Sequence, residues 1–543
     1  MAPHADFDDS NRDIVRLPAP GRPSFSASPP RLVIIGAGNR GIAYGTAIGE
    51  STNGICVGVV EPIAQKRRQF GRKYIWGKAE PAPGQEFADW RDFLSWEEER
   101  RKRVATGEKG VPDGVDGIFV CVQDRMHKEV VLGLAPLGIH LMCEKPLATS
   151  LEDCVAIYKS LLPDSSVPPS KIFSIGHVLR YTPHNMLLRK LLLEDKVIGD
   201  VMSVNHTEPV GWWHFTHSYV RRGNWRKEST SAPSLLAKSC HDMDVLLWLL
   251  CSPPPGSSKP AHLPTSISSS GSLQYFNKSR KPIEAGNATN CLSCDYEPSC
   301  QFSAKRQYVG TQMGSRQDHF VSVVLPEIED VVAAGGPEAG RKALLSRLGE
   351  DYDDSMPASE VSKKNWFGRC VYEADNDVCD NQTVTMTWEN DPIAAEGENR
   401  LQALTGRGSK TATLHMVAFT KKICERFTNI YGTSGEIYAD SASITVENFH
   451  IGEKKVHYPS IAADGGHGDG DSGLARQFVL AIDRVKNHGQ SVPTAQQEFI
   501  GCSLEEVIRS HAMVFAAEEA RKEKLVVDFP SWWEREVAGM LKV

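Results

Sequence analysis

The chain has 543 residues, and 61 Lys and Arg against 68 Asp and Glu give it a formal net charge of −7. A prior of about 150 residues per domain predicts three to four domains, enough to bury a sizeable core. The slight acidity argues against a dedicated nucleic-acid or anionic-membrane surface, and no run approaches the ~18 to 20 apolar residues that a membrane helix needs. We therefore expect a soluble globular protein with no nucleic-acid or membrane partner.

Residues 1–30 hold six prolines and four aspartates and no apolar core behind a basic start. This composition is unlike a secretory signal and predicts a disordered tail. The 13 cysteines are an odd number in a long chain. Without an export signal, they favour reduced thiols and a cytoplasmic location.

Folded sequence is expected to begin at residue 31. Short apolar runs that end in glycine or acidic residues are typical of buried parallel strands. These strands are predicted at 32–35, 55–60, 117–122 and 139–143, with helices between them at 41–47, 91–106 and 128–137. Alternating strands and helices predict a doubly wound Rossmann domain over residues 31–150.

After a connecting helix at 151–162 the pattern changes, because most later strands follow one another without a helix. Such strands are predicted at 172–175, 201–208, 268–275, 382–388, 411–418 and 426–431, with helices at 474–485 and 504–521. They predict an α+β domain over 151–543 with a large, mainly antiparallel open sheet. We expect surface inserts near 252–300, 327–362 and 390–408, and a homo-oligomer formed through the sheet.

Residues 36–41 read Gly-Ala-Gly-Asn-Arg-Gly and follow the first predicted strand. In the G-x-G-x-x-G spacing, Gly36 permits a tight turn, Gly38 lets the backbone approach a pyrophosphate, and Gly41 lets helix and strand pack closely. The phosphates then lie on the helix N-terminus beside Asn39 and Arg40. The segment predicts a dinucleotide site.

Glu61 ends the second predicted strand, 20 residues beyond Gly41. A carboxylate at this position accepts from both ribose hydroxyls of an adenosine and repels a 2′-phosphate, so it favours NAD. Arg67 and Arg68 follow closely and could still reach a 2′-phosphate, which keeps NADP possible. The alternative is a glycine turn followed by a solvent-exposed glutamate.

The triplet Glu144-Lys145-Pro146 directly follows the fourth predicted strand, and here the chain resembles the Gfo/Idh/MocA family of sugar and cyclitol oxidoreductases. The turn at 122–127, with Gln123 and His127, resembles the family's strand-end turn beside the dinucleotide. Further similar segments are 176–181, 212–214, 223–225, 237–244, 368–372, 375–377, 432–436 and 466–471. The resemblance covers most of residues 31–525 and is closer to a subgroup with large inserts. It implies that Gln123, His127, Glu144 and Lys145 lie by the cofactor.

The resemblance implies that Lys145 lies beside the nicotinamide and hydrogen-bonds a substrate hydroxyl, and that Pro146 can take a cis bond. The residue pattern agrees, since a lysine at the end of a parallel strand points into the crevice where such folds bind ligands. Partial burial would lower its pKa toward neutrality, which suits proton exchange with an alcohol. The alternative is a surface lysine beside a turn proline.

His241 lies three residues beyond Lys238, on the same face of a predicted helix. Family members commonly carry an aspartate four residues before this histidine, where this chain has Ala237. His241 is still our candidate for the general acid/base, with Lys238 as its electrostatic partner or a second hydroxyl ligand. A neighbouring ammonium would lower the imidazole pKa. The alternative is a core histidine beside a snorkelling lysine.

Four further residues, Arg180, Tyr181, Trp213 and His214, combine polar groups for hydroxyls with aromatic faces that could stack on a sugar ring. Aromatic residues of a sheet are as often core.

His467, with Asp469 and Asp471, lies in a glycine-rich loop and could cap the site over a polyol. For Asp471 we favour helix capping together with Ser472.

Cys291, Cys294 and Cys300 form the pattern C-x2-C-x5-C. Three thiolates could hold zinc if a fourth ligand folds in, but free thiols are favoured and no metal is expected.

Together these features predict an NAD(P)-dependent dehydrogenase that moves a hydride between the cofactor and a secondary hydroxyl or ketone of a sugar, sugar acid or cyclitol. Lys145 and His241 would handle the proton. One alternative is a glycosidase of the same fold that uses bound NAD transiently. Another is a non-catalytic, dinucleotide-sensing regulator, against which the presence of both Lys145 and His241 argues.

Overall fold

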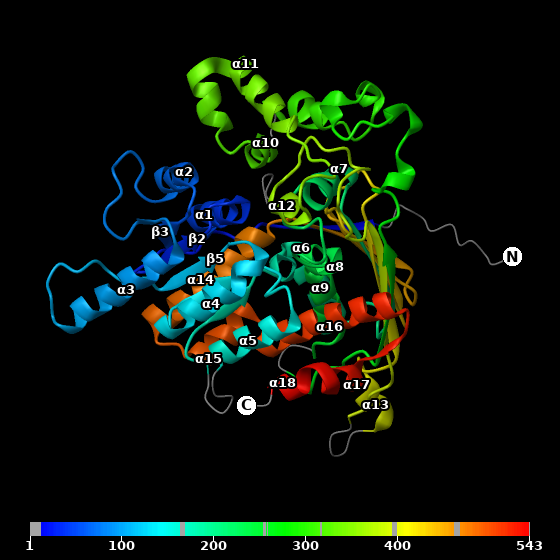
Figure 1. Ribbon diagram of the computed structural model, residues 1–543. Coiled ribbons are helices and arrows are strands. Elements are labelled where there is room, and N and C mark those ends of the chain that lie inside the picture. Colours follow the sequence, from blue (N-terminus) through cyan, green and yellow to red (C-terminus); the bar gives the residue numbers. More distant parts are fainter. Residues whose placement is uncertain are drawn as a thin grey trace.

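The computed structural model describes residues 12–162, 169–253, 257, 259–314, 318–393, 399–460 and 467–541. Two sheets organise the chain. A six-stranded sheet carries the N-terminal part, and a ten-stranded sheet carries the C-terminal part. A helical lobe rises above the larger sheet at the top of Figure 1.

The six-stranded sheet is parallel throughout, in the order β4-β3-β2-β5-β6-β7. The central strands β2, β5 and β6, and the neighbouring β7, are almost fully buried, as expected for a parallel sheet covered on both faces. The strands are β2 (Arg31–Ile35), β3 (Ile55–Val60), β4 (Glu86–Phe87), β5 (Gly117–Val120), β6 (His140–Cys143) and β7 (Phe173–Ile175). The helices are α1 (Asn39–Ser51), α2 (Ala64–Tyr74), α3 (Trp90–Ala105), α4 (His127–Leu134) and α5 (Leu151–Leu161).

Strand β7 corrects one expectation. The segment 172–175 was expected in the second, antiparallel sheet, but β7 pairs in parallel with β6, Cys143 opposite Ile175. Helix α5 is the crossover that a parallel strand pair needs, so it belongs to a β-α-β unit and does not link two domains. The first sheet therefore extends beyond residue 150.

The ten-stranded sheet has the order β1-β15-β14-β13-β12-β8-β11-β10-β9-β16 and is antiparallel except at β1–β15 and β8–β11. This confirms the expected combination of a Rossmann domain with a large, mainly antiparallel sheet. The strands are β1 (Arg12–Leu17), β8 (Val201–Pro209), β9 (Ser266–Ser272), β10 (Asn381–Trp388), β11 (Lys410–Val417), β12 (Phe427–Gly432), β13 (Gly435–Ala439), β14 (Ile444–Asn448), β15 (Glu453–Pro459) and β16 (Val527–Asp528).

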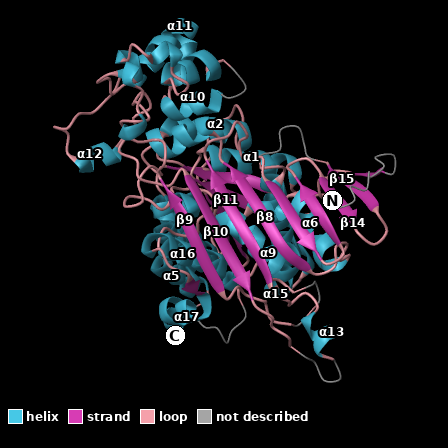
Figure 2. Ribbon diagram, turned by 90° about the vertical axis from the view of Figure 1, so that its right-hand side faces the viewer, coloured by secondary structure: helices cyan, strands magenta, loops and turns pink. Residues whose placement is uncertain are grey.

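Helices cover one face of this sheet. Along β10 every second residue is buried, and α9 and α16 lie behind the strands in the view of Figure 2. The helices of this part are α6 (Pro183–Arg189), α7 (Trp212–Phe215), α8 (Ser234–Ala237), α9 (Cys240–Leu250), α13 (Arg400–Leu404), α14 (Gly470–His488), α15 (Val492–Ala495), α16 (Leu504–Glu523), α17 (Phe529–Trp533) and α18 (Gly539–Leu541).

The expectation of a disordered tail is wrong for residues 12–30, while residues 1–11 lie outside the described residues. Strand β1 pairs in parallel with β15 at the sheet edge. The following segment is tied to the Rossmann side, where Arg22 Nε donates to the Thr52 carbonyl at 2.7 Å. The open edge of β15 offers unpaired backbone groups, and pairing with β1 satisfies them.

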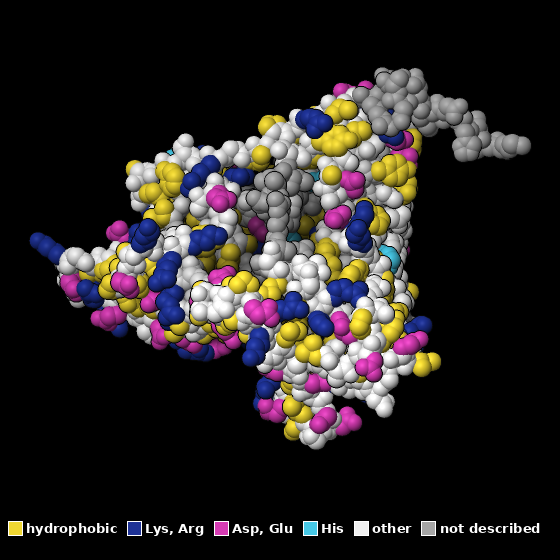
Figure 3. Space-filling view, turned by 90° about the horizontal axis from the view of Figure 1, so that it is seen from above, with side chains coloured by type: hydrophobic (Ala, Val, Ile, Leu, Met, Phe, Trp, Pro, Cys, Tyr) yellow, Lys and Arg dark blue, Asp and Glu magenta, His cyan; other side chains and the backbone are white. Residues whose placement is uncertain are grey.

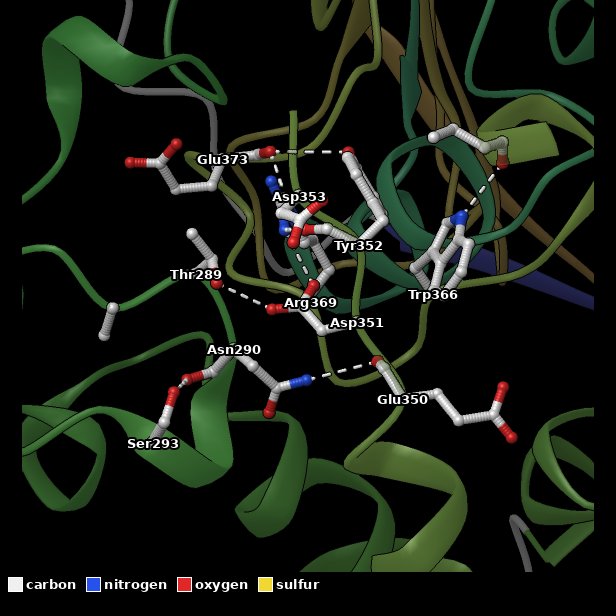
Figure 4. Close-up of polar contacts among 12 residues, drawn as sticks. Thr289, Asn290, Ser293, Glu350, Asp351, Tyr352, Asp353, Trp366, Arg369 and Glu373 are labelled. Carbon is white, nitrogen blue, oxygen red and sulfur yellow. Dashed lines mark hydrogen bonds and ion pairs between the residues drawn. The ribbon is translucent and has the colours of Figure 1, made fainter. Parts of the chain in front are cut away.

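The insert expected near 327–362 and the second part of the one expected near 252–300 lie in one helical lobe between β9 and β10, whereas the first part of 252–300 contains strand β9 itself. The lobe contains α10 (Asp318–Val324), α11 (Ile328–Leu348) and α12 (Ala358–Lys363). It has a core of its own, which includes Tyr308, Leu344 and Phe367. In Figure 4, Arg369 binds Asp351 at 2.7 Å, and Asp351 also accepts from Thr289 at 2.6 Å. The lobe is thus a packed unit with a polar network at its base.

Helix α14 returns from the C-terminal part to pack on the Rossmann domain. Phe478 of α14 meets Phe119 of β5 edge to face, with ring centroids 5.2 Å apart. A Cβ at Gly473 would lie 2.3 Å from the Tyr181 carbonyl oxygen, so the contact requires glycine. At its start, Asp471 of α14 binds Arg40 of α1, so this end of the helix lies beside the glycine-rich loop.

None of the helices among the described residues combines the length and the apolar character needed to cross a membrane.

Candidate active site

The glycine-rich loop has the geometry of a phosphate cradle. A Cβ at Gly41 would lie 2.0 Å from the Gly36 carbonyl oxygen, and one at Gly36, whose φ is +97°, would lie 2.5 Å from the Cys121 carbonyl oxygen. A Cβ at Gly38 would meet nothing within 4 Å. The first and third glycines are thus needed for the fold, whereas the second keeps space open above the N-terminus of α1, which no side chain caps. The loop fits a dinucleotide pyrophosphate.

Glu61 is held against this loop by two backbone donors. Its Oε2 accepts from Ala37 N at 2.9 Å and its Oε1 from Ile63 N at 3.0 Å. Arg67, a candidate for a 2′-phosphate, binds the Glu61 carbonyl oxygen and Glu86 Oε2. The carboxylate is therefore fixed at the edge of the loop, and Arg67 is already engaged.

Arg40 links the loop to both the end of β6 and the start of α14. Its Nε donates to Glu144 Oε1 at 2.8 Å, and its two Nη atoms bind the Asp471 carboxylate at 2.7 and 3.0 Å. Tyr44 donates to the same Glu144 oxygen at 2.7 Å. Burial tends to raise the Glu144 pKa, but Arg40 and Tyr44 together lower it below its usual range. Capping by Asp471, which we favoured, is wrong, because Asp471 serves Arg40 and helix α14 has no side-chain cap.

Lys145 follows β6 and lies partly buried at the carboxyl edge of the sheet. The Lys145–Pro146 bond is cis, as the resemblance implied. The ammonium donates to the Ala237 carbonyl oxygen at 2.8 Å. The residue that stands in place of the family's usual aspartate therefore contacts Lys145 through its backbone.

His241 lies in the first turn of α9 and is 2 % exposed. Its Nε2 is 3.4 Å from Arg426, and its Nδ1 is buried with no hydrogen-bond partner among the described residues. Burial, followed by the charges of Lys145, Arg426 and Lys238, lowers the His241 pKa well below its usual value. The ring is neutral at pH 7, and Nδ1 is its one nitrogen that no described residue contacts.

Lys238 is held in a buried ion-pair network. Its Nζ lies 3.2 Å from Glu208 Oε1 and 2.9 Å from Cys424 Sγ. Glu208 also binds Arg426 at 2.9 Å, and Arg426 in turn binds Asp242 next to His241. Burial favours the neutral amine, but Cys424 and Glu208 more than offset it and raise the Lys238 pKa. Lys238 is thus a fixed cation near His241.

Three of the predicted site residues have their polar atoms occupied elsewhere. Arg180 forms a bidentate pair with Asp244 at 2.7 and 2.8 Å in the core. The Tyr181 hydroxyl donates to the Ile500 carbonyl. Both ring nitrogens of His127 contact backbone carbonyls, Pro146 O at 2.7 Å and Val122 O at 3.2 Å. These residues support the turns around the site and have no free group for a ligand.

His214 and Gln123 are better placed than Trp213 to contact a ligand. Burial and the nearby ammonium groups of Lys238 and Lys145 lower the His214 pKa well below its usual value. Gln123 is exposed at the end of β5. Trp213 packs edge to face on Phe320 of the lobe, with centroids 4.6 Å apart, and so serves packing.

Glu208 and Arg426 were not found from the sequence. Glu208 lies at the end of β8 and Arg426 just before β12, and neither belongs to a recognisable motif. Only the pairing of β12 with β8 brings them to the same place.

Two cavities lie at opposite ends of the parallel strands, and this position decides which of them can be the cofactor cleft. A cavity of 690 Å³ lies near Arg31 and Ile55, at the amino ends of β2 and β3. A smaller one of 230 Å³, lined by Gln123, Asp124 and Trp225, lies at the carboxyl ends. Ligands of doubly wound sheets bind at the carboxyl ends, so the larger cavity is not the cofactor cleft.

All 13 cysteines are free, and Cys291 Sγ accepts from Arg221 at 3.7 Å. Across the described ranges, no three His, Cys, Asp or Glu side chains form a group that could hold a metal ion.

The fold and the glycine cradle define a dinucleotide-binding protein. Residues 30–162 match the model of a family described as "Oxidoreductase family, NAD-binding Rossmann fold" (GFO_IDH_MocA). Residues 30–162 therefore form a domain similar to the NAD-binding domain of this family, and the rest of the chain lies outside the match.

Known relatives are similar over this domain. A 2,7-anhydro-N-acetylneuraminate hydratase of Escherichia coli is 32 % identical over 136 residues, 25 % of this chain and 34 % of the relative. An inositol 2-dehydrogenase of Paracoccus denitrificans is 31 % identical over 137 residues, 25 % and 35 % of the two chains. The matches thus span about a third of the length of these relatives. A solved levoglucosan dehydrogenase with NADH and levoglucosan has the same fold, with TM-score 0.54 and 14 % identity over 92 % of this chain and 99 % of that one.

Proposed function

We propose that the protein is an NAD-dependent dehydrogenase that transfers a hydride between the nicotinamide and a secondary hydroxyl or ketone of a sugar, sugar acid or cyclitol. The observation that carries the proposal is the convergence of Lys145, His241 and His214 at the carboxyl edge of the sheet that also bears the glycine cradle. Dehydrogenation needs an oxygen ligand and a proton acceptor next to the cofactor, and these side chains supply both.

When bound, NAD supplies the hydride acceptor. Gly38, Asn39 and the N-terminus of α1 would hold its pyrophosphate, and Glu61 its adenosine ribose. Because Glu61 is fixed by two backbone donors and Arg67 is occupied, NAD is favoured over NADP.

In the proposed reaction, Lys145 and His241 are the residues that bind the substrate oxygen and transfer its proton. Among the residues that the structure describes, the Lys145 ammonium donates to a backbone carbonyl and to no carboxylate, so it can donate to a substrate oxygen instead. The neutral His241 then takes the hydroxyl proton as the oxygen becomes a carbonyl, and returns it in the reverse direction. Burial, Lys145 and Arg426 disfavour an imidazolium at this position, which favours release of the proton from His241.

The names of similar proteins support this substrate class. They include dehydrogenases of inositol and levoglucosan, both of which are polyhydroxylated rings. The hydratase among the relatives keeps a second possibility open, in which the oxidation is transient and the overall reaction is redox-neutral. We also propose that the open face of the ten-stranded sheet joins copies of the chain, which light scattering would show as a mass above 59.8 kDa.

The test is a panel of sugars, sugar acids and cyclitols with NAD or NADP, followed by the absorbance of the reduced cofactor. We expect NAD reduction with at least one polyol, and a drop of about 10³-fold in kcat for Lys145→Ala, since a positioned proton-transfer group contributes roughly 10²- to 10⁴-fold. The exposed Lys102→Ala variant, on α3, is the matched control and should keep full activity.

Full activity of Lys145→Ala would overturn the assignment. Substrate cleavage without net NADH would favour the glycosidase or hydratase type of reaction. Cofactor binding without turnover of any substrate would favour a dinucleotide sensor.

A further inference from the structure

The burial of His241 creates a problem for the proposed reaction. Its ring is 2 % exposed, and each oxidation of a hydroxyl leaves one proton on the base that accepted it. That proton has to reach water before the next turnover. A group between His241 and solvent is therefore needed.

His467 lies in this position. Its ring centroid is 6.3 Å from that of His241, and its side chain is 30 % exposed. The two rings meet at 62°, edge to face. At this separation of the rings, one water molecule or substrate hydroxyl fits between them.

Asp471 orients the His467 ring for proton transfer. The His467 Nδ1 lies 3.2 Å from Asp471 Oδ2, so the neutral ring carries its proton on Nδ1 and presents the Nε2 lone pair. Because Asp471 is clamped by Arg40 at 2.7 and 3.0 Å, it keeps its charge and orientation.

We propose that His467, oriented by Asp471, carries the proton from His241 to solvent; this role rests on the proposed dehydrogenase function. The substrate O–H bond breaks toward His241, the new His241 N–H bond breaks toward His467 Nε2 through one bridging water, and solvent takes the proton from His467. No electrons move in these transfers, so each hydride transferred leaves one proton in water.

The groups that face His467 come from three elements. Arg40 of α1 lies 3.5 Å from its Nδ1, Asp471 belongs to α14, and His241 belongs to α9. Glu144 lies behind Arg40. The Arg40 guanidinium and the Asp471 carboxylate thus place opposite charges next to His467.

The test compares His467→Asn with His450→Asn, an exposed histidine in the turn between β14 and β15. In dilute buffer we expect kcat of His467→Asn to fall about tenfold or more, while the rate of NADH formation in a single turnover stays within about twofold of wild type. Added imidazole should restore kcat, because a small base can replace the lost carrier. His450→Asn should change neither quantity. Fluorescence of bound NADH shows whether the variant is folded, and His467→Gln replaces it if it is not.

A His467 variant that binds NADH and keeps wild-type kcat and pH profile in dilute buffer would overturn the proton-exit role alone. An equal loss in single turnover and steady state, without imidazole rescue, would overturn it too. A wild-type protein that reduces no NAD contradicts the dehydrogenase function itself, so the two failures are distinguishable.

Discussion

Two lysines of the site differ in what holds them. Lys145 donates to one backbone carbonyl, whereas Lys238 is paired with the buried Glu208. Removing a partner from a buried pair leaves an uncompensated charge, while removing Lys145 leaves one neutral backbone carbonyl without its donor. The first lysine is free to act on a ligand, and the second maintains the structure around His241.

This difference predicts separate effects of two equivalent substitutions. Lys238→Met should lower the free energy of unfolding by about 3 kcal/mol, and Lys145→Met by less than about 1 kcal/mol. Urea denaturation of the two variants measures both values. Equal destabilisation would contradict the distinction between a structural and a catalytic lysine.

Glu61 should set cofactor choice. The Glu61→Gln substitution keeps the shape of the side chain but removes its negative charge. Hydrogen bonds to charged groups contribute roughly 1.5–3 kcal/mol. We therefore expect NAD affinity to fall about tenfold and the preference for NAD over NADP to shrink. Binding of both reduced cofactors, measured by fluorescence, checks this. Glu86→Gln, next to Arg67, is the control. Tight NADP binding by the wild-type protein would refute the role of Glu61.

At the scale of elements, the glycine-rich turn separates folding from binding. Gly41→Ala places a methyl group 2.0 Å from a carbonyl oxygen, whereas Gly38→Ala places it in open space. We expect Gly41→Ala to destabilise the protein by about 2 kcal/mol or more, as overpacking does. Gly38→Ala should leave the midpoint of thermal unfolding unchanged and abolish NAD binding. Calorimetry and cofactor titration of both variants test this, and unimpaired NAD binding by Gly38→Ala would contradict it.

Local patterns predicted most elements well, and failed where pairing is decided at long range. The Rossmann strands and the cradle were predictable because each depends on a short apolar run and nearby glycines. Strand β1 was missed because only its partner β15, more than 400 residues later, makes it a strand. Strand β7 was assigned to the wrong sheet because its three residues carry no sign of direction.

For the site, too, the sequence predicted the residues that lie in local motifs and missed those that only long-range pairing brings together. Lys145, His241 and the cradle lie in motifs. Glu208 and Arg426 meet only through sheet pairing, and Arg180 and Tyr181 belong to the core although their residue types suit a sugar site.

At the scale of the whole molecule, the charged side chains are spread over the surface, whereas several histidines lie in the interior. Lys and Arg side chains are interspersed with Asp and Glu over the face in Figure 3, consistent with the small net charge. Several histidines are buried in the neutral form. Burial lowers the pKa of His177 to about 3 and those of His140 and His262 to about 4.

These histidines predict acid sensitivity. Their pKa values in the folded protein lie below the unfolded value of about 6.5, so the unfolded chain binds more protons between about pH 6.5 and pH 4, and stability falls as pH falls through that range. The urea midpoint should be lower at pH 5 than at pH 7, and His140→Gln should reduce the difference. A midpoint that stays constant or rises at pH 5 would contradict this account.

The central claim is that hydride passes from a substrate carbon to NAD in the site formed by Lys145 and His241. A substrate from the panel, deuterated at the oxidised carbon, tests it most directly. We predict that mass spectrometry finds the deuterium in the reduced cofactor, and that Lys145→Ala binds NAD but transfers almost none. Substrate turnover with no deuterium in the cofactor would contradict the claim.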